Sequence, residues 1–251
     1  MPKSRPEMTG SGPAVRGVDV HAVHKSATMF LYQFFGRLSE KQGFDFYSEN
    51  NSPANQSGLS IDNQRDFCRC PIRSFEVLKT ELDHPTQIYR IFHIRDPRDI
   101  LVSEYFSFGW IHPTAGTGLE AARQERQEIP IDEYVLTQCE KRTWPLEAKF
   151  KILLDRDIDP EYDIIVTYET MVTRFRLWAE RVLPAFGVRY PKVAALQWAW
   201  RYRKEFQRTG ESMTHKRRIT PGDHRIKLKP ATIDQLNQRF ETILTRFNYS
   251  F

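Results

Sequence analysis

Short apolar runs and longer segments of helical periodicity alternate along this chain. The runs 18–23, 44–47, 67–73, 88–94 and 163–169 are rich in apolar, β-branched and aromatic residues. Runs of this length and composition predict buried β-strands. A segment with apolar residues at helical spacing follows most of them. This order predicts a single-domain α/β fold, with a mostly parallel sheet flanked by helices on both faces.

Helices are predicted where apolar residues recur every three or four positions. These segments are 28–42, 74–82, the one opened by Asp96 and Pro97, 119–128, 131–150 with a break at Pro145, 171–186, 193–206 and 233–247. Local start and stop signals support several of them. Gly43 is a C-terminal stop for the first helix. Asp96 and Pro97 suit an N-cap and a first helical position, and Thr232 is the predicted N-cap of the last helix.

Length and composition fit one domain. The chain has 251 residues, of which 40% are hydrophobic and 13% aromatic, enough to bury a sizeable core. Residues 1–17 mix proline, glycine, serine and charge without periodicity, which predicts a mobile N-terminal tail before a domain at 18–251. The tail lacks the apolar region of a signal peptide, and no run approaches the length of a membrane span. We therefore expect a cytoplasmic protein.

Cysteine usage and net charge restrict the chemistry. Cys68, Cys70 and Cys139 are too few and too oddly numbered for a disulfide framework, and their spacing makes a poor zinc site. We expect reduced thiols and no metal. The formal net charge of +5 favours anionic ligands without identifying one.

The junction between the first strand and the first helix has the features of a phosphate-binding turn. A helix N-terminus exposes unpaired N–H groups and the positive end of the helix dipole, and Lys25 adds a full charge there. Ser26 and Thr28 add hydroxyl donors. The Walker A pattern GxxxxGK[ST] is absent, which argues against a magnesium-nucleotide P-loop. Taken alone, this turn also fits an ordinary helix start.

A second junction places an arginine at the end of a strand. Arg95 follows the run 88–94, and Ser103 lies about two helical turns further along. A guanidinium offers bidentate donors to a phosphate, and a hydroxyl adds a third hydrogen bond. The alternative is a structural helix cap with a surface ion pair.

These two junctions resemble the motifs of the sulfotransferases that use 3′-phosphoadenosine 5′-phosphosulfate (PAPS). The family loop P-K-S-G-T-T-W is matched by H-K-S-A-T-M-F, which begins at His24. The family pattern R-N-P-x-D-x-x-x-S-x-Y is matched by R-D-P-R-D-I-L-V-S-E-Y, which begins at Arg95. A third match, to Y-E-x-M, begins at Tyr168. The family segment R-K-G-x-x-G-D-W-K is matched less well by R-R-I-T-P-G-D-H-R at 217–225.

The resemblance implies a sulfotransferase fold with a P-loop-like turn and a PAPS site. In the family, the loop binds the 5′-phosphosulfate, the arginine, serine and basic pair lie at the 3′-phosphate, and two aromatic residues contact adenine. The matching positions here are Lys25, Ser26, Ala27, Thr28, Met29, Phe30, Arg95, Ser103, Tyr168, Arg217 and Arg218. A core position is the alternative for Phe30 and Tyr168, and a basic surface run is the alternative for 217–218.

The implied reaction is in-line transfer of a sulfuryl group from PAPS to a hydroxyl or amine, leaving adenosine 3′,5′-bisphosphate (PAP). Charge builds on the bridging oxygen as its bond to sulfur breaks. A cation and a helix N-terminus aimed at that oxygen stabilise the transition state more than the ground state. Lys25 is the residue expected in this role, and no metal is needed.

The residue that removes the acceptor's proton departs from the family pattern. In the family strand K-T-H-x-P, matched here by 67–71, Arg69 replaces the histidine, and arginine cannot serve as a base. Sulfotransferases that act on heparan-type sugars carry a glutamate a little over twenty residues after the loop lysine. Glu49 lies 24 residues after Lys25. Glu49 is therefore the hypothetical base, and His24 is the second choice.

Two other classes of protein fit parts of the pattern. A nucleotide kinase would need a Walker lysine or paired carboxylates for magnesium, and neither is evident. A basic RNA-binding protein would carry a module signature, and none is present, so we expect no nucleic-acid partner. The sequence does not identify the acceptor, because a polar metabolite, a phenol, a steroid or a sugar would all fit. The aromatic content and the missing histidine favour a small molecule, and the oligomeric state stays open.

Overall fold

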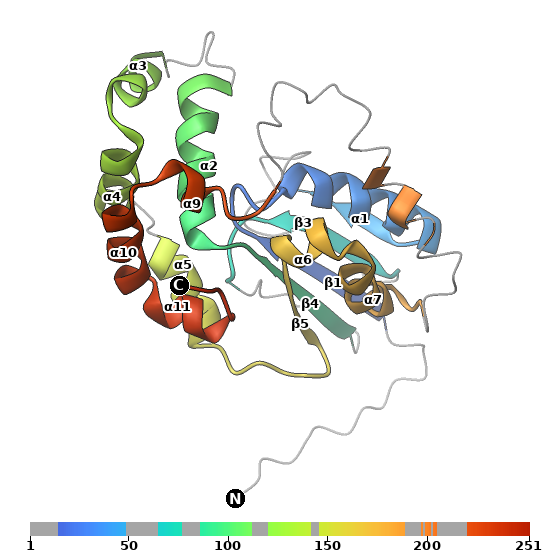
Figure 1. Cartoon of the computed structure of the whole chain (residues 1–251). Helices are drawn as coiled ribbons and strands as arrows, with labels where there is room; N and C mark the ends of the chain where they lie inside the picture. The colour runs from blue at the N-terminus through green and yellow to red at the C-terminus, as the bar shows by residue number, and fades with distance from the viewer. Residues whose placement is uncertain are drawn as a thin grey trace, which may run out of the picture.

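A single parallel sheet organises the molecule. The computed structural model describes residues 15–48, 65–76, 86–111, 120–141, 146–188, 197, 199–201, 203–204 and 220–251. Within them, five strands form one sheet in the order β2-β3-β1-β4-β5 (Figure 1). The strands are β1 (Val15–Ala22), β2 (Asp45–Tyr47), β3 (Phe67–Ile72), β4 (Thr86–Ile94) and β5 (Asp163–Thr167). Every neighbouring pair runs parallel, which confirms the predicted α/β fold.

Most helices lie where the periodicity predicts them. They are α1 (Thr28–Gln42), α2 (Pro97–Phe106), the π-helical η2 (Ser107–Ile111), α3 (Glu120–Glu128), α4 (Ile131–Lys141), α5 (Leu146–Leu154), α6 (Tyr168–Thr173), α7 (Phe175–Val182), the 3-10 helix η3 (Leu183–Phe186), α9 (His224–Lys227), α10 (Pro230–Arg239) and α11 (Glu241–Arg246). Of the predicted helix 74–82, only 74–76 are described, and they form a bend. The described residues between 197 and 204 are helical.

Helices cover both faces of the sheet (Figure 1). On one face, Val18, Val20 and Ala22 of β1 pack with α1, α6 and α7. On the other face, Phe92 and Ile94 of β4 pack with α2, α4, α5, α10 and α11. Burial on both faces explains why the strands appear in the sequence as continuous apolar runs. In the part of the chain that the structure describes, no helix is long and apolar enough to cross a membrane.

The first strand begins earlier than predicted. β1 starts at Val15, so residues 15–17, which composition assigns to the N-terminal tail, belong to the sheet. Val15 is in register with Thr86 of β4, and the backbone N–H of Arg16 donates to Asp66 Oδ1 at 2.8 Å. Pairing with a neighbouring strand, which local composition does not reveal, sets this boundary.

The strand predicted over 163–169 ends two residues early. Thr167 ends β5 and caps α6, because its Oγ1 accepts a hydrogen bond from the Thr170 backbone N–H at 3.0 Å. Tyr168 and Glu169 are therefore in the first turn of a helix and not in the strand. The single helix predicted over 171–186 is also divided, since the non-helical backbone of Arg174 (φ −134°, ψ 55°) separates α6 from α7.

The last predicted helix is two helices with a different start. Thr232 is not its N-cap, because α10 begins at Pro230 with Lys229 in the capping position. Proline fixes φ near the helical value, so it fits the first helical position. Phe240 separates α10 from α11, whereas the periodicity predicts one helix over 233–247.

Three of the sequence motifs begin at the same edge of the sheet, where their strands end. β1, β4 and β5 are neighbours, and the register pairs Ala22 with His93 and Ile94 with Thr167. The segments that follow these strands therefore begin side by side. β2, which precedes Glu49, is not a neighbour of β1, because β3 lies between them. Glu49 itself is outside the described residues.

Candidate functional site

The turn between β1 and α1, residues 23–27, has an unusual backbone; we call it the Lys25 turn. Lys25 and Ala27 both have φ of 67°, in the left-handed region that favours glycine. Ala27 is the position at which the sulfotransferase motif has glycine, so the alanine keeps the glycine conformation. Left-handed residues alternating with right-handed ones curl the backbone so that successive N–H groups line a concave surface for an anion.

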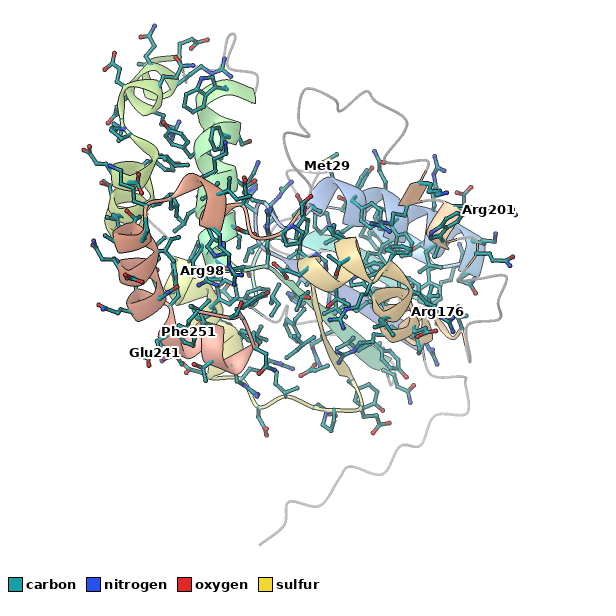
Figure 2. All side chains as sticks on the ribbon, in the orientation of Figure 1. Met29, Arg98, Arg176, Arg201, Glu241 and Phe251 are labelled. Atoms are coloured by element: carbon teal, nitrogen blue, oxygen red, sulfur yellow. The ribbon has the colours of Figure 1, made fainter. Side chains whose placement is uncertain are left out.

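The helix that follows the Lys25 turn begins without a cap. Ala27 provides no capping side chain, and the first turn of α1 contains no acidic residue. By contrast, Asp96 caps α2 and Thr167 caps α6 through their side-chain oxygens. The amides at the start of α1 and its dipole are therefore left for an external anion. Met29, in this first turn, is 53% exposed (Figure 2).

Lys25 reaches across the edge of the sheet to the end of α2. Its Nζ donates a hydrogen bond to Ser107 Oγ at 2.6 Å and lies 5.8 Å from the centre of the Phe108 ring. Burial lowers the pKa of Lys25, the charge of Glu104 raises it, and that of Arg95 lowers it. Sequence reasoning misses both Ser107 and Glu104 as neighbours of the lysine.

Arg95 connects two of the sequence motifs to each other. It is buried, and its guanidinium donates to the backbone carbonyl of Lys25. The same guanidinium lies over the Tyr168 ring, 4.2 Å from the ring centre. The structure thus brings the predicted residues Lys25, Arg95 and Tyr168 together. Ser103 lies half-buried on α2, about two turns after Arg95.

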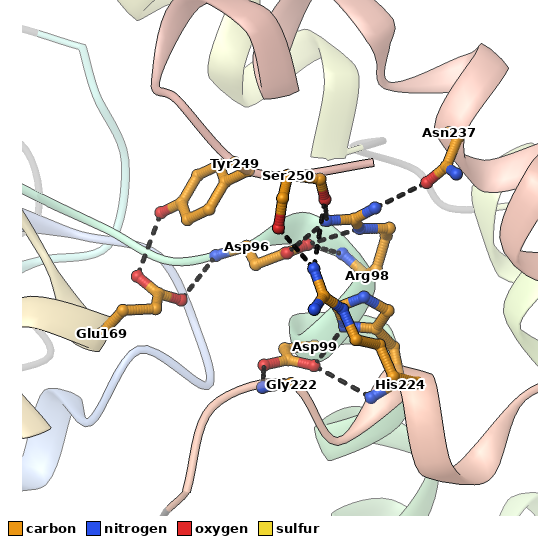
Figure 3. A network of polar contacts seen from close by, with 10 residues as sticks. Asp96, Arg98, Asp99, Glu169, Gly222, His224, Asn237, Tyr249 and Ser250 are labelled. Carbon is orange, nitrogen blue, oxygen red and sulfur yellow. Dashed lines mark hydrogen bonds and ion pairs between the residues drawn. The ribbon is translucent and has the colours of Figure 1, made fainter. Parts of the chain in front are cut away.

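The charged residues after Arg95 hold the fold around it. Asp96 caps α2, and its carboxylate pairs with the Arg98 guanidinium at 2.7 Å. Arg98 is almost fully buried between α2 and the C-terminal helices, where it donates to Asn237 Oδ1 and to the carbonyl of Ser250 (Figures 2 and 3). Asp96 and Arg98 of the R-D-P-R-D run therefore link Ser250, near the end of the chain, to the start of α2.

Asp99 anchors the segment that carries the fourth motif. Its carboxylate accepts hydrogen bonds from Gly222 N at 2.7 Å, His224 N at 3.0 Å and His224 Nδ1 at 2.7 Å (Figure 3). Burial by itself would raise the pKa of Asp99, but the His224 hydrogen bonds and the charge of Arg95 hold it at about 2. The Gly-Asp pair of the motif is thus attached to α2. Arg217 and Arg218, which precede it, are outside the described residues.

Glu169 supports the backbone next to Arg95. Its Oε1 accepts from the Asp96 backbone N–H at 3.1 Å, and its Oε2 accepts from the Tyr249 hydroxyl at 3.2 Å (Figure 3). Burial raises the pKa of Glu169 to about 7, and the hydrogen bond from Asp96 opposes this shift. The two residues of the Y-E pair therefore have different contacts. The Tyr168 ring packs against the Arg95 guanidinium, and the Glu169 carboxyl accepts hydrogen bonds from Asp96 and Tyr249.

The hydroxyl of Ser26 is used inside the Lys25 turn, which corrects its predicted role. Ser26 is fully buried, and its Oγ donates to the Val23 carbonyl at 2.6 Å, so that donor is not directed at a phosphate. His93 is fully buried near the Ser26 backbone, and Trp178 Nε1 donates to His93 Nδ1 at 3.4 Å. Burial lowers the pKa of His93 to about 3, so it is neutral.

Phe30 belongs to the core, which decides between its two interpretations. The side chain is 5% exposed, and its ring stacks on Phe34 at 5.6 Å and meets Phe175 edge-on at 6.2 Å. We therefore do not include its ring in the ligand site. Thr28 begins α1 and is half-buried at the helix N-terminus.

Arg69 is fully committed to a partner. Its Nε and one terminal nitrogen donate to the two carboxylate oxygens of Asp19, both at 2.6 Å, and both side chains are buried. Of the two predicted bases, His24 is exposed in the Lys25 turn and Glu49 is outside the described residues. Among the described side chains, no cluster of histidine, cysteine, aspartate and glutamate is suited to a metal ion.

Comparison with solved structures identifies the fold. The mouse sulfotransferase SULT7A1 complexed with PAP matches with a TM-score of 0.64 at 13% identity, covering 92% of this chain and 86% of that one. Retinol dehydratase with androsterone and the inactive cofactor PAP has a TM-score of 0.56 at 10% identity, covering 92% and 81%. Its complex with retinol and PAP has a TM-score of 0.58 at 11% identity, covering 93% and 82%. No protein-family model and no curated protein sequence matches. The chain has the fold of these sulfotransferases.

Proposed function

We propose that this chain is a sulfotransferase that uses PAPS as its sulfuryl donor. The observation that carries the proposal is the convergence at one sheet edge of an uncapped helix N-terminus, Lys25 and Arg95. Two cations and a helix N-terminus without a side-chain cap at one place suit a ligand with two separated anionic groups. The fold shared with PAP-bound sulfotransferases supports the same donor.

The residues divide between the two ends of that donor. The first-turn amides of α1 and Lys25 suit the 5′-phosphosulfate, because they provide N–H donors and a positive charge. Arg95 and Ser103 suit the 3′-phosphate, and the predicted pair at 217–218 would join them. Tyr168 holds the Arg95 guanidinium on its ring and is the predicted adenine neighbour.

Lys25 has the central chemical role in this proposal. Bound PAPS supplies a sulfuryl group and a leaving phosphate. As charge grows on the bridging oxygen, the Lys25 ammonium and the amides of α1 stabilise it without reorganisation. Ser107 holds the lysine in the absence of ligand, since the hydrogen bond between Lys25 Nζ and Ser107 Oγ measures 2.6 Å.

The acceptor is proposed to be a small molecule with a hydroxyl or amine group. Aromatic side chains contact one another at the end of α2 and in η2, and Lys25 approaches one neighbouring ring, that of Phe108. The mutual contacts join Tyr105, Phe106 and Trp110. Trp110 is 45% exposed, so this surface has apolar area available for a ligand. Androsterone and retinol, which are named in the retinol dehydratase complexes, have this apolar character.

The first experiment measures thermal unfolding with and without PAP, and with ATP and magnesium as a comparison. A ligand at 100 times its dissociation constant stabilises by about 2.7 kcal/mol, which for this length raises Tm by roughly 5 to 10 °C. Lys25→Ala and Arg95→Ala are expected to remove the rise. Lys151→Ala and Arg176→Ala are matched controls, because those side chains are 71% and 79% exposed. A rise with ATP alone, or no rise in a folded protein, contradicts the proposal.

The base is tested separately, because donor binding does not depend on it. Glu49→Gln and His24→Ala are compared for sulfuryl transfer at several pH values. If Glu49 removes the acceptor proton, its variant binds PAP normally and loses turnover by two or more orders of magnitude, about the usual size of a general-base effect. Turnover near wild type in Glu49→Gln eliminates Glu49 and transfers the role to His24, whose variant then shows the loss.

A further inference from the structure

A buried carboxylate lies beside the proposed transfer lysine, although an anion site would be expected to exclude it. Glu104 is 2% exposed, within α2. The backbone N–H of Ser107 donates to the Glu104 carbonyl, so the two residues are one turn apart on the same face of the helix. Ser107 is the residue that accepts the hydrogen bond from Lys25. Glu104 therefore lies one helical turn from the residue that Lys25 contacts, close enough for its charge to raise the pKa of the lysine.

We propose that Glu104 is a positioning residue that keeps Lys25 protonated and directed at the donor site. The inference rests on the proposed sulfotransferase function, in which Lys25 acts as a cation. It goes beyond the motif resemblance, because none of the matched positions assigns a role to Glu104.

The charges around Lys25 explain why a carboxylate is needed. Arg95 hydrogen-bonds to the carbonyl of Lys25 from the end of β4, and the positive end of α1 follows the lysine in sequence. Arg126 of α3 lies over the same Phe108 ring that Lys25 approaches. Burial of the ammonium and the charge of Arg95 favour the neutral amine. Among the described groups that shift the pKa of Lys25, Glu104 is the one that raises it.

A neutral Lys25 would not serve the proposed reaction. An uncharged amine neither attracts the phosphosulfate strongly nor stabilises the charge that develops on the bridging oxygen. Glu104 weakens the net attraction of the site for an anion, but it preserves the charge at the atom where charge is needed. Loss of the carboxylate should therefore affect turnover at alkaline pH much more than it affects PAP binding at pH 7.

The decisive experiment reads the protonation of Lys25 directly, without substrate. Limiting acetic anhydride labels lysines in their neutral form, and peptide mass spectrometry gives the extent of labelling at Lys25 from pH 6 to 11. Lys151, which is 71% exposed, is the internal reference. In Glu104→Gln, the midpoint for Lys25 is expected to fall by about 1 to 3 pH units, the usual effect of a close opposite charge. In Glu104→Asp it returns toward wild type, while Lys151 does not move.

An unchanged Lys25 midpoint in a folded Glu104→Gln protein overturns the inference. If that variant does not fold, Glu104→Asp carries the test, because a longer separation between the charges must still lower the midpoint measurably. The activity measurement then follows: the alkaline limb of kcat moves to lower pH in Glu104→Gln, whereas the PAP-induced Tm rise at pH 7 is retained. Failure of the proposed function would show instead as no PAP effect in the wild type, with the labelling result unaffected.

Discussion

Replacing Glu169 with glutamine is expected to remove a pH-dependent part of the stability of this fold. Glu169 accepts hydrogen bonds from the Asp96 backbone and from the Tyr249 hydroxyl, at 3.1 and 3.2 Å. Burial raises its pKa to about 7, so the folded protein favours the neutral carboxyl up to neutral pH. Glutamine keeps an acceptor for the Asp96 N–H, and its amide is able to donate to the tyrosine oxygen. The substitution therefore removes the ionisation and retains the contacts.

The magnitude follows from the size of the pKa shift. The ordinary pKa of this carboxyl is 4.5, so a value of about 7 corresponds to about 3 kcal/mol at about 1.4 kcal/mol per unit. Because the folded-state pKa is the higher one, this stability is fully present below pH 4.5 and is lost as the pH rises through about 7. Glu169 retains some solvent contact, which reduces the expected loss to about 2 kcal/mol.

Urea unfolding at pH 5, 6, 7, 8 and 9 measures this effect. The free energy of unfolding of the wild type relative to Glu169→Gln should fall by about 2 kcal/mol from pH 5 to pH 9, with most of the fall below about pH 7 and little change at higher pH. Glu241→Gln is the control, because that carboxylate is exposed on α11. A difference between wild type and Glu169→Gln that stays constant across the pH range would refute the assignment of a buried, proton-binding carboxyl to Glu169.

Three further substitutions test the supports of the site. Asp99→Asn should lower the free energy of unfolding at pH 7 by about 2 kcal/mol, because the hydrogen bonds from His224 and the charge of Arg95 hold an ionised carboxylate with a pKa of about 2 against the effect of burial. In urea titrations the deficit should shrink as the pH falls from about 4 toward 2, and a deficit that persists at pH 2 would contradict this assignment. Ala27→Val should cost at least about 2 kcal/mol and Ala27→Gly should stay within about 1 kcal/mol of wild type, because φ is 67° there; thermal unfolding with equal losses in both variants would exclude backbone strain. Arg69→Met should destabilise the fold by about 3 to 5 kcal/mol, because it leaves the buried Asp19 carboxylate without its charge partner. In urea unfolding, the double variant with Asp19→Asn should recover most of that loss. A double variant as unstable as the single one would show that packing dominates over charge.

The elements that could be predicted from the sequence are those set by local chemistry. The strands appear as apolar runs because both faces of the sheet are buried, and the helix after Arg95 begins where Asp96 and Pro97 satisfy its first amides. The meeting of Lys25 and Arg95 also follows from local information together with one rule. Parallel neighbouring strands end at one edge, so residues that follow them come together.

The interactions that could not be predicted depend on partners far away in the chain. Asp99 is bound by residues more than 120 positions later, and no local pattern indicates that its carboxylate fixes the Gly222 segment. His93 is one polar residue in an apolar strand, and no local pattern indicates that it is fully buried and hydrogen-bonded by Trp178, 85 residues later. The end of β5 could be predicted only in part. Thr167 is a good N-cap, but the apolar run before it favours a strand that continues to residue 169.

The position of Arg69 separates it from the residues of the proposed donor site. The register places Arg69 opposite Asp19, three residues before the carboxyl end of β1, which is about 10 Å below the edge at 3.3 Å per residue. A histidine at position 69 would therefore leave the Asp19 carboxylate buried without its charge partner. The arginine and the aspartate form one structural unit inside the sheet, whereas Lys25 and Arg95 act above it. In the proposed reaction, an arginine at position 69 means that a different element must remove the acceptor's proton, while Lys25 and Arg95 still meet at the proposed anion-binding edge.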